Sequence, residues 1–258
     1  MVDNLKRLYE YKSLLINFTN KEIKLKYKNS ILGFLWSFLN PLVMLGIYTF
    51  VFKYVIKIQI EDFELFLFSG LISWTFLNST IVMSSNSLIN QGNLIKKVYF
   101  PREVIPLSVV FSNFINYMVM IVIIFLATLL IQGEVSSHIY LLPLIIGITI
   151  LFTTGLSLIV SIMTVKYRDV SYLVEVLLLF LFYMTPIVYS QELVPTEYLY
   201  LISLNPFNWM VSLHRAVFLP GINFEWTDFN ALFVVSLLVF WIGYSLFKKK
   251  EMSIVEKL

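Results

Sequence analysis

Long runs of apolar residues alternate with short polar segments along most of the chain. A helix needs about 20 apolar residues to cross a bilayer. The pattern therefore predicts an all-α membrane protein with six transmembrane helices and short loops. The predicted spans are residues 33–56, 63–85, 104–131, 139–165, 170–190 and 229–247. Asn40-Pro41 lies inside the first span, where proline removes a backbone hydrogen bond and kinks the helix, and the fifth span ends at Thr185-Pro186, another helix breaker.

The segment before the first span is polar but amphipathic. Leu8, Tyr11, Leu15 and Phe18 recur at three- and four-residue steps, which predicts a helix with an apolar stripe. Thr19 followed by Glu22 has the spacing of a capping box, so we expect a second helix to start at this point.

A lysine-rich face follows the apolar stripe in the same segment. A helix of this kind lies at the cytoplasmic headgroups, where lysine favours anionic lipid. It is either a plain membrane anchor or also a contact for a cytosolic partner. We therefore divide the chain into a cytoplasmic amphipathic interface helix, residues 1–32, and a transmembrane domain, residues 33–258. The polar face consists of Lys21, Glu22, Lys24 and Lys28.

The cations are distributed unevenly between the two sides predicted for the membrane. Sixteen of the 19 Lys and Arg residues fall in the N-terminal segment, the second and fourth loops, and the C-terminal tail. The other three, Lys53, Lys57 and Arg215, lie on the opposite side. Basic loops stay in the cytosol. The pattern thus predicts a multi-pass protein of the bacterial cytoplasmic (inner) membrane with N- and C-termini cytoplasmic.

The polar loop between the second and third spans predicts a short cytoplasmic helix over residues 88–101. Leu88, Gln91 and Ile95 share one face of it with Val98, and Pro101 stops it. A short helix across the ends of two spans can sit in a groove of a cytosolic protein and move both spans. An ordinary connecting helix is the alternative.

The loop between the last two spans, residues 191–228, is the largest feature of the outer side. Its two apolar pieces, Tyr198–Leu204 and Phe207–Leu219, are separated by Asn205-Pro206. Each is too short to cross a bilayer, so we expect re-entrant or interfacial helices. They form either an aromatic anchor that caps the bundle or an outer gate over a substrate path.

Composition and residue types exclude several kinds of chemistry. Apolar residues make up 59% of the chain and charged residues 14%, against roughly 25% charged in soluble domains. Cysteine is absent, and His138 and His214 fall in different outer loops, so no metal site is expected. The net charge of +3 follows from the loop pattern and does not indicate nucleic acid.

An energy source is also missing from the sequence. There is no G-x-x-x-x-G-K-S/T phosphate loop, so we expect no cofactor on this chain. Glu175 is the one candidate for an intramembrane charge relay, and it lies close to the cytoplasmic end of its span. A transport function would therefore need a partner ATPase that uses ATP and Mg²⁺.

Four motifs, in order along the whole chain, resemble those of type-2 ABC exporter permeases, in the branch that exports polysaccharides such as O-antigen, capsule or teichoic acid. They are residues 24–33 running into Trp36 and Asn40-Pro41, residues 93–102 with Pro106-Leu107, Tyr167-Arg168-Asp169, and residues 185–190 with Asn205-Pro206 and Arg215. Lys26 and Lys28 stand where arginine is common in that family.

The resemblance implies a homodimer with two copies of an ABC ATPase subunit. It implies an undecaprenyl-linked polysaccharide as the substrate, moved between membrane leaflets. The implied ATPase-coupling residues are Asn93, Leu94, Ile95, Lys96, Lys97, Phe100, Pro101 and Arg102, with a second cytoplasmic turn at Tyr167, Arg168 and Asp169. The implied outer gate residues are Pro186, Asn205, Pro206 and Arg215. We name Trp36, Tyr48, Tyr183 and Tyr189 as substrate-path residues, because aromatic faces suit a sliding sugar chain.

Two other functions remain open at this point. One is a type-2 ABC permease for drugs or lipids. The other is a membrane-embedded transferase that depends on a polyprenyl phosphate, for which His214 and Arg215, with Glu192 and Glu197 nearby, are the candidate residues.

Overall fold

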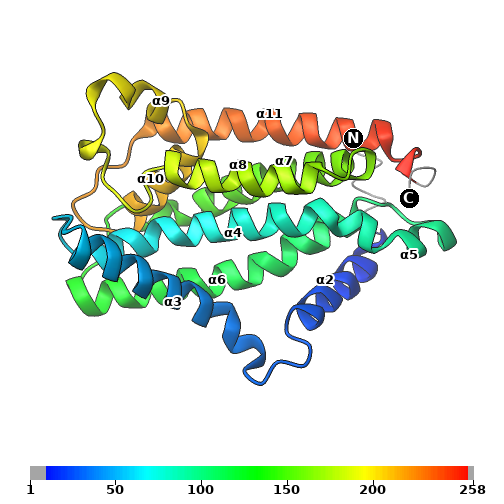
Figure 1. Cartoon of the computed structure of the whole chain (residues 1–258), viewed down its shortest axis with the longest axis horizontal. Coiled ribbons are helices and arrows are strands. Elements are labelled where there is room, and N and C mark those ends of the chain that lie inside the picture. Colours follow the sequence, from blue (N-terminus) through cyan, green and yellow to red (C-terminus); the bar gives the residue numbers. More distant parts are fainter. Residues whose placement is uncertain (1–9, 255–258) are drawn as a thin grey trace.

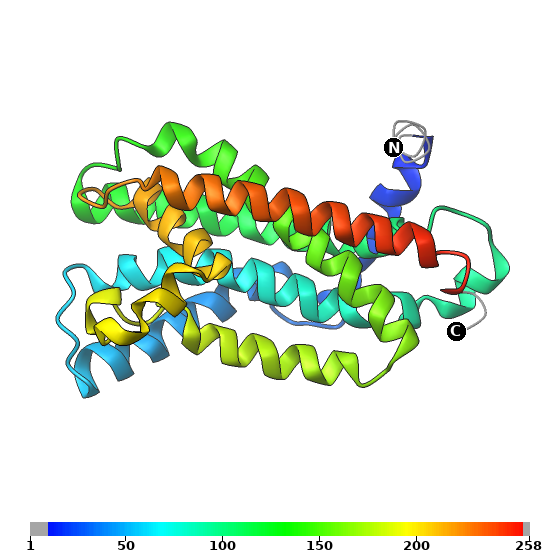
Figure 2. The same cartoon turned by 90° about the horizontal axis from the view of Figure 1, so that it is seen from above.

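The computed structural model describes residues 10–254, and this part of the chain consists of helices joined by short loops. The long helices run side by side along one direction (Figures 1 and 2). Five helical segments are long and apolar enough to cross a membrane, which confirms a multi-pass all-α membrane protein. They are Gly33–Val55, Phe63–Asn90 (α4), Val104–Gln132 (α6), Ile139–Lys166 and Trp226–Lys250 (α11). The first contains α3 (Trp36–Thr49) and a π-helical turn (Phe50–Val55), and the fourth contains α7 (Leu142–Lys166).

The fifth predicted span ends earlier than expected. Its helix, α8, runs from Val170 to Met184 and has 15 residues. At 1.5 Å per residue this is about 22 Å, less than the ~30 Å of a hydrocarbon core. Thr185 is extended, with φ −104° and ψ 130°, because Pro186 disfavours the helical conformation of the residue before it. The helix thus ends at Thr185-Pro186, where the proline predicted a break, and only the outer bound of residue 190 for this span was wrong.

The polar segments gather at two ends of the bundle. The N-terminal helix α2 (Lys12–Lys26), the short helix α5 (Gly92–Lys97) and the C-terminal end of α11 lie at the right-hand end in Figure 1. Helices α9 (Leu199–Ser203) and α10 (Pro206–Phe218) lie at the other end. The segments that hold most of the cations are thus on one side, as the charge pattern indicates. The part of the predicted interface helix before residue 10 lies outside the described residues.

Helix α2 is continuous through the predicted capping box. Thr19 lies inside the helix and is buried, and its hydroxyl donates to the carbonyl of Leu15 at 2.8 Å. A threonine hydroxyl that bonds back four residues supports the helix interior and does not cap a new one. The predicted restart at Thr19 was therefore wrong.

The cytoplasmic helix between α4 and α6 is shorter than the predicted 88–101. Leu88 belongs to α4. The helix is interrupted at Gln91, and the six residues of α5 follow. Val98 is extended, with φ −130° and ψ 136°, and it is 53% exposed. The predicted common face of Leu88, Ile95 and Val98 therefore does not exist, because two of the three lie outside α5.

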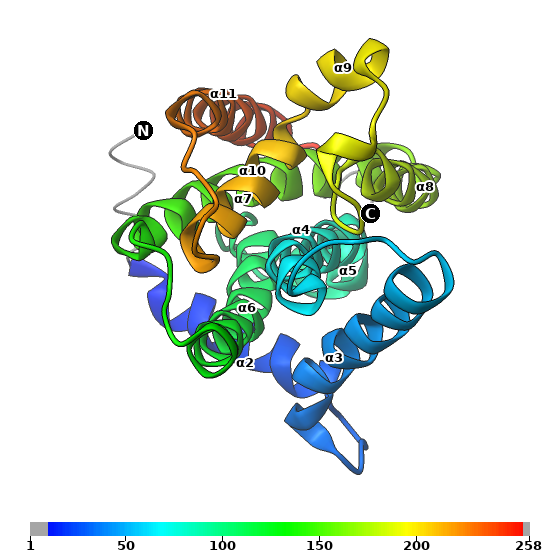
Figure 3. The same ribbon diagram turned by 90° about the vertical axis from the view of Figure 1, so that its left-hand side faces the viewer.

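Helix α4 is the centre of the bundle. In its apolar stretch 72% of the residues are buried, a larger share than in the other four long apolar segments. The end-on view shows α4 enclosed by α3, α6, α8 and α10 (Figure 3). A separate apolar cluster, which we call the basal cluster, lies at the end that holds α2 and α5. It includes Phe18, Leu88, Ile95, Phe100, Leu158, Phe247 and Ile254.

Candidate functional site

A groove of about 380 Å³ runs between α3, α4 and α8, and we call it the α3–α8 groove. Figure 3 shows α3 and α8 flanking α4 on this side of the bundle. The polar side chains in its lining are hydroxyls, amides and one carboxylate, which can hydrogen-bond to sugar hydroxyls. They are Asn40, Thr75, Asn78, Ser79 and Glu175.

Three aromatic rings form one wall of this groove. The rings of Tyr48 and Phe182 stack with centroids 5.6 Å apart, and Trp74 lies 5.6 Å from Phe182 at an angle of 59°. These separations are typical of favourable aromatic pairs. The three rings, one each from α3, α4 and α8, thus place an aromatic cluster next to the polar lining, and Tyr48 is the most exposed of them. Aromatic and hydrogen-bonding groups side by side suit a ligand that is polar at its edges and apolar on its faces, such as a sugar ring.

The four predicted path residues fall into two groups. Tyr48 lines the groove, and Trp36 lines an adjoining space of about 120 Å³ that shares Asn40 with the groove. Tyr183 is 57% exposed, and its carbonyl accepts a hydrogen bond of 2.9 Å from the Tyr189 hydroxyl. Tyr183 and Tyr189 thus lie together at the end of α8 and outside the groove lining.

Sequence reasoning did not identify Trp74 or the amide and hydroxyl groups of α4 that line the groove. Trp74 is 6% exposed and lies in a helix that is apolar on nearly every side. No hydrophobic periodicity marks the groove-facing side of such a helix. Asn78 and Ser79, two adjacent polar residues in the middle of an apolar run, were the available signal.

At the opposite end from α2 and α5, Asn205-Pro206 starts helix α10. The Asn205 side chain accepts from the Phe207 amide at 3.0 Å, and Pro206 occupies the first turn, where its missing N–H costs nothing. The amide of Asn205 also donates to the Thr185 hydroxyl at 3.1 Å. The predicted gate residues Asn205 and Pro186 therefore belong to one contact region, since Pro186 follows Thr185 and is buried.

Helix α10, in the connection predicted for the outer side, packs against the bundle with His214 and Arg215 in its buried part. His214 is 0% exposed and Arg215 5% exposed. The Arg215 guanidinium lies 3.6 Å from the centre of the Phe66 ring and donates to the Ile187 carbonyl at 2.7 Å. A charged group at this depth is stabilised by such partners.

His214 ties α10 to two further groups. Its Nδ1 lies 2.7 Å from the Met210 carbonyl, which can only accept, so Nδ1 carries the proton. Nε2 is then the acceptor for the Tyr117 hydroxyl of α6. His214 and Arg215, the candidate residues of the transferase alternative, are thus engaged in contacts that hold α10 in place.

The end of the bundle that holds α2 and α5 presents a mixed surface. On α5, Asn93, Lys96 and Lys97 are exposed, whereas Ile95 and Phe100 are buried in the basal cluster. Leu94 is half-buried and Pro101 is buried. In the turn between α7 and α8, Tyr167, Arg168 and Asp169 are all exposed. These two exposed segments are the parts of the predicted coupling set that a partner can reach.

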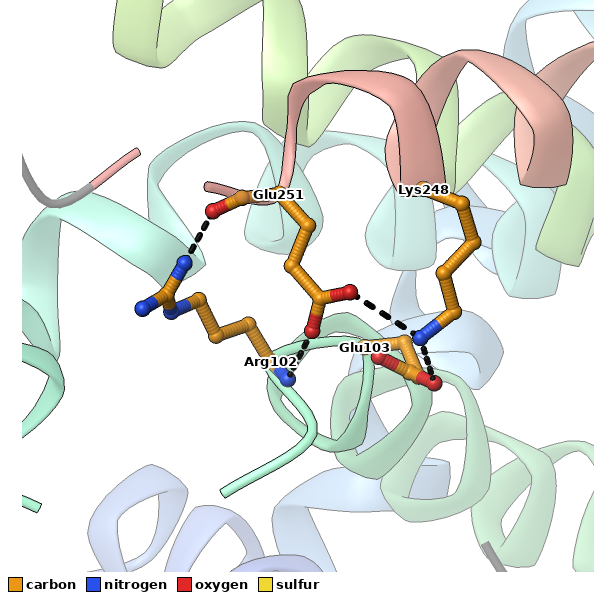
Figure 4. A network of polar contacts seen from close by, with 4 residues as sticks. All are labelled: Arg102, Glu103, Lys248 and Glu251. Carbon is orange, nitrogen blue, oxygen red and sulfur yellow. Dashed lines mark hydrogen bonds and ion pairs between the residues drawn. The ribbon is translucent and has the colours of Figure 1, made fainter. Parts of the chain in front are cut away.

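Arg102 does not belong to that reachable surface. It is 8% exposed, and its side chain points to the C-terminal turn of the chain (Figure 4), where it donates to the carbonyl of Glu251. A partner protein therefore cannot bind its guanidinium directly while this contact persists.

The interface helix contacts the start of α5. Lys21 Nζ donates to Gln91 Oε1 at 2.8 Å. Burial raises the pKa of the Glu22 carboxyl, with a smaller opposing effect from Lys21. Lys24 and Lys28 are exposed. The Lys21–Gln91 hydrogen bond therefore links α2 to the junction between α4 and α5.

Among the described residues, five helical segments long and apolar enough to cross a membrane and a groove lined by aromatic, amide and hydroxyl groups fit a membrane permease. The sequence model of the ABC-2 type transporter family matches residues 14–219. The chain belongs to this family.

Curated relatives cover nearly the whole chain. The chain is 35% identical over 246 residues to the O-antigen export system permease protein RfbA of Klebsiella pneumoniae, covering 94% of each chain. It is 28% identical over 260 residues to the RfbA protein of Myxococcus xanthus, covering 100% of each. It is 26% identical over 240 residues to the polysialic acid transport protein KpsM of Escherichia coli, covering 90% of this chain and 91% of that one.

Proposed function

We propose that this chain is the permease subunit of an ATP-driven exporter that moves a lipid-linked polysaccharide, such as O-antigen, across the bacterial inner membrane. Its relatives carry the names of O-antigen export and polysialic acid transport proteins. The carrier in this proposal is an undecaprenyl-type lipid, and the substrate moves from the cytosolic to the outer leaflet.

The observation that carries the proposal is the α3–α8 groove. Hydrogen-bonding groups from α3 and α4 line it together with the rings of Tyr48, Trp74 and Phe182. Stacking on aromatic rings is weak and repeats from one sugar to the next, so a polymer can slide along the wall. A permease for apolar drugs or lipids has less use for Asn40, Thr75, Asn78 and Ser79.

The proposal includes a homodimer with two copies of a separate ABC ATPase, which binds ATP and Mg²⁺. The outer faces of α3 and α8 beside the groove are apolar and exposed, with Ile47 at 51% and Phe180 at 57%. A second copy of the chain that faces these surfaces would enclose the groove. In this arrangement α8, extended by residues 185–190, serves as the sixth span, and both termini lie in the cytosol.

The ATPase contact is tested by charge reversal at matched positions. Lys97→Glu changes an exposed cation of α5, and Lys57→Glu makes the same change at an exposed cation in the connection that precedes the first residue of α4. We expect Lys97→Glu to reduce copurification with the ATPase and glycan export, while both variants insert into the membrane. Equal association and export in the two variants would remove α5 from the ATPase interface.

The cargo is tested in vesicles that contain the purified complex. ATP-dependent appearance of lipid-linked glycan in the opposite leaflet supports the proposed function. Transport of an apolar drug without transport of glycan would favour the drug-permease alternative.

A further inference from the structure

The end of α11 and the turn that follows it, residues 248–254, lie against the loop between α5 and α6 (Figure 4). The backbone N–H of Arg102 donates to Glu251 Oε1 at 3.1 Å, and the Arg102 guanidinium donates to the Glu251 backbone carbonyl. One residue of the C-terminal turn thus binds both the main chain and the side chain of one loop residue. This double contact fixes the loop against the end of α11.

An ion pair lies next to this contact. Lys248 Nζ lies 2.5 Å from Glu103 Oε1 and 3.1 Å from Glu251 Oε2. Glu103 is 1% exposed, and burial raises the pKa of its carboxyl while Lys248 opposes the shift. Removing one partner of a pair with a buried carboxylate leaves an uncompensated charge, so such a pair is costly to break. The network therefore joins the first residue before α6 to the last turn of α11.

An apolar contact reinforces the polar one. Phe247 and Ile254, on either side of Glu251, are buried in the basal cluster together with Ile95 of α5. Phe100 in the connecting loop belongs to the same cluster and stacks on Phe18 of α2 at 5.9 Å. The buried face of α5 and the C-terminal turn therefore share one core and cannot separate without exposing it.

The other end of this connection is rigid. Helices α7 and α11 cross at Gly155 and Gly243, where a Cβ added at Gly243 would lie 2.4 Å from the Gly155 carbonyl oxygen. Backbones in direct contact leave no side-chain freedom to absorb a displacement. A movement imposed on α11 is thus passed to α7.

We propose that residues 248–254 form a clasp that transmits displacement of the α5–α6 loop to the α7–α11 pair. Arg102 and Glu251 are its positioning residues, and Glu103 and Lys248 are its ionic link. The inference rests on the proposed ATP-driven function and deepens it. With the clasp, a displacement of α5 moves the α7–α11 pair as well as the flanking helices α4 and α6.

The functional test compares two variants of the C-terminal turn in the complex with the ATPase. Glu251→Ala removes the carboxylate that joins Arg102 and Lys248, and Lys249→Ala removes an exposed neighbouring cation. The measured quantity is glycan exported per ATP hydrolysed, at equal amounts of assembled complex. We expect a fall of about fivefold or more for Glu251→Ala, which is the lower end of typical coupling effects, and no change for Lys249→Ala. A wild-type ratio in Glu251→Ala would overturn the proposal.

A distance measurement shows whether the clasp moves together with the α5–α6 loop or only stabilises the fold. It can be made on the otherwise unaltered chain, so it does not depend on a destabilising variant. The chain has no cysteine, so spin labels attach where they are introduced. The exposed positions are Val98→Cys in the loop, Met252→Cys in the clasp and Val43→Cys on α3. Between nucleotide states of the complex, we expect a constant 98–252 distance and a changed 98–43 distance. In the Glu251→Ala background the 98–252 distance should also change.

The outcomes separate the two proposals. A 98–252 distance that changes as much as the 98–43 distance in the otherwise unaltered chain would refute the clasp and leave the export function intact. A wild-type chain that neither assembles with the ATPase nor exports glycan would refute the proposed function, and the clasp as a coupling device with it.

Discussion

The contact between α7 and α11 gives the sharpest test of the fold. Gly243→Ala places a methyl group against the backbone of α7, 2.4 Å from the Gly155 carbonyl oxygen and 3.1 Å from its carbonyl carbon. Favourable carbon–oxygen contacts lie at about 3.3–3.6 Å, so the helices must separate by roughly 1 Å. Both clashing groups are main-chain atoms of a helix, and no rotamer change can relieve them.

The magnitude follows from two opposing effects. Overpacking of a well-packed contact costs about 1–3 kcal/mol, and a backbone clash belongs at the upper end. Alanine improves helix propensity over glycine by about 1 kcal/mol. The expected net loss of unfolding free energy is therefore about 2 kcal/mol, equivalent to a midpoint roughly 4–8 °C lower for a chain of this size.

The assay is thermal unfolding of the purified chain in detergent, compared with Gly147→Ala. Gly147 lies on the same helix as Gly155, is exposed, and has nothing within 4 Å of an added Cβ. We expect the Gly147 variant to unfold at or above the wild-type midpoint. A Gly243→Ala midpoint equal to that of Gly147→Ala would refute the close helix crossing.

Two further predictions concern α10 and the groove. Tyr117→Phe leaves Nε2 of the fully buried His214 without its hydrogen-bond donor. The free energy of unfolding should therefore fall by about 1–3 kcal/mol. The control Tyr140→Phe, at a position 68% exposed, should leave the unfolding midpoint unchanged in the same thermal assay. Trp74→Ala removes one ring of the aromatic wall and should lower glycan export at equal membrane abundance, whereas Trp241→Ala, at a position 62% exposed, should not. Equal export by the two tryptophan variants would argue against a sugar path along the α3–α8 groove.

Sequence patterns predicted the elements well wherever a local signal existed. Apolar runs located the five long spans, because hydrophobic length is a property of one segment. The cation distribution correctly grouped α2, α5 and the C-terminal end on one side. Asn205-Pro206 correctly separated α9 from α10, because both residues have specific preferences at a helix start.

Local patterns failed where two conformations of the same segment compete. Thr19 can cap a helix or bond back inside one, and the packing of α2 on the basal cluster favours the continuous helix. The α4–α6 connection follows helical spacing in sequence, but burial of Ile95 and Phe100 shortens the helix to Gly92–Lys97. In both cases tertiary contacts overrode a valid local preference.

By itself, the sequence determined that this protein is a helical membrane permease, where its spans lie and which ends carry the charge. The tertiary structure decided which face of each span is buried, that α10 lies inside the bundle with His214 and Arg215, and that Arg102 binds Glu251. The physical reason is that lipid is as apolar as a protein core. An apolar helix therefore carries no periodic signal for its buried side, and only contacts between helices that are distant in sequence select it.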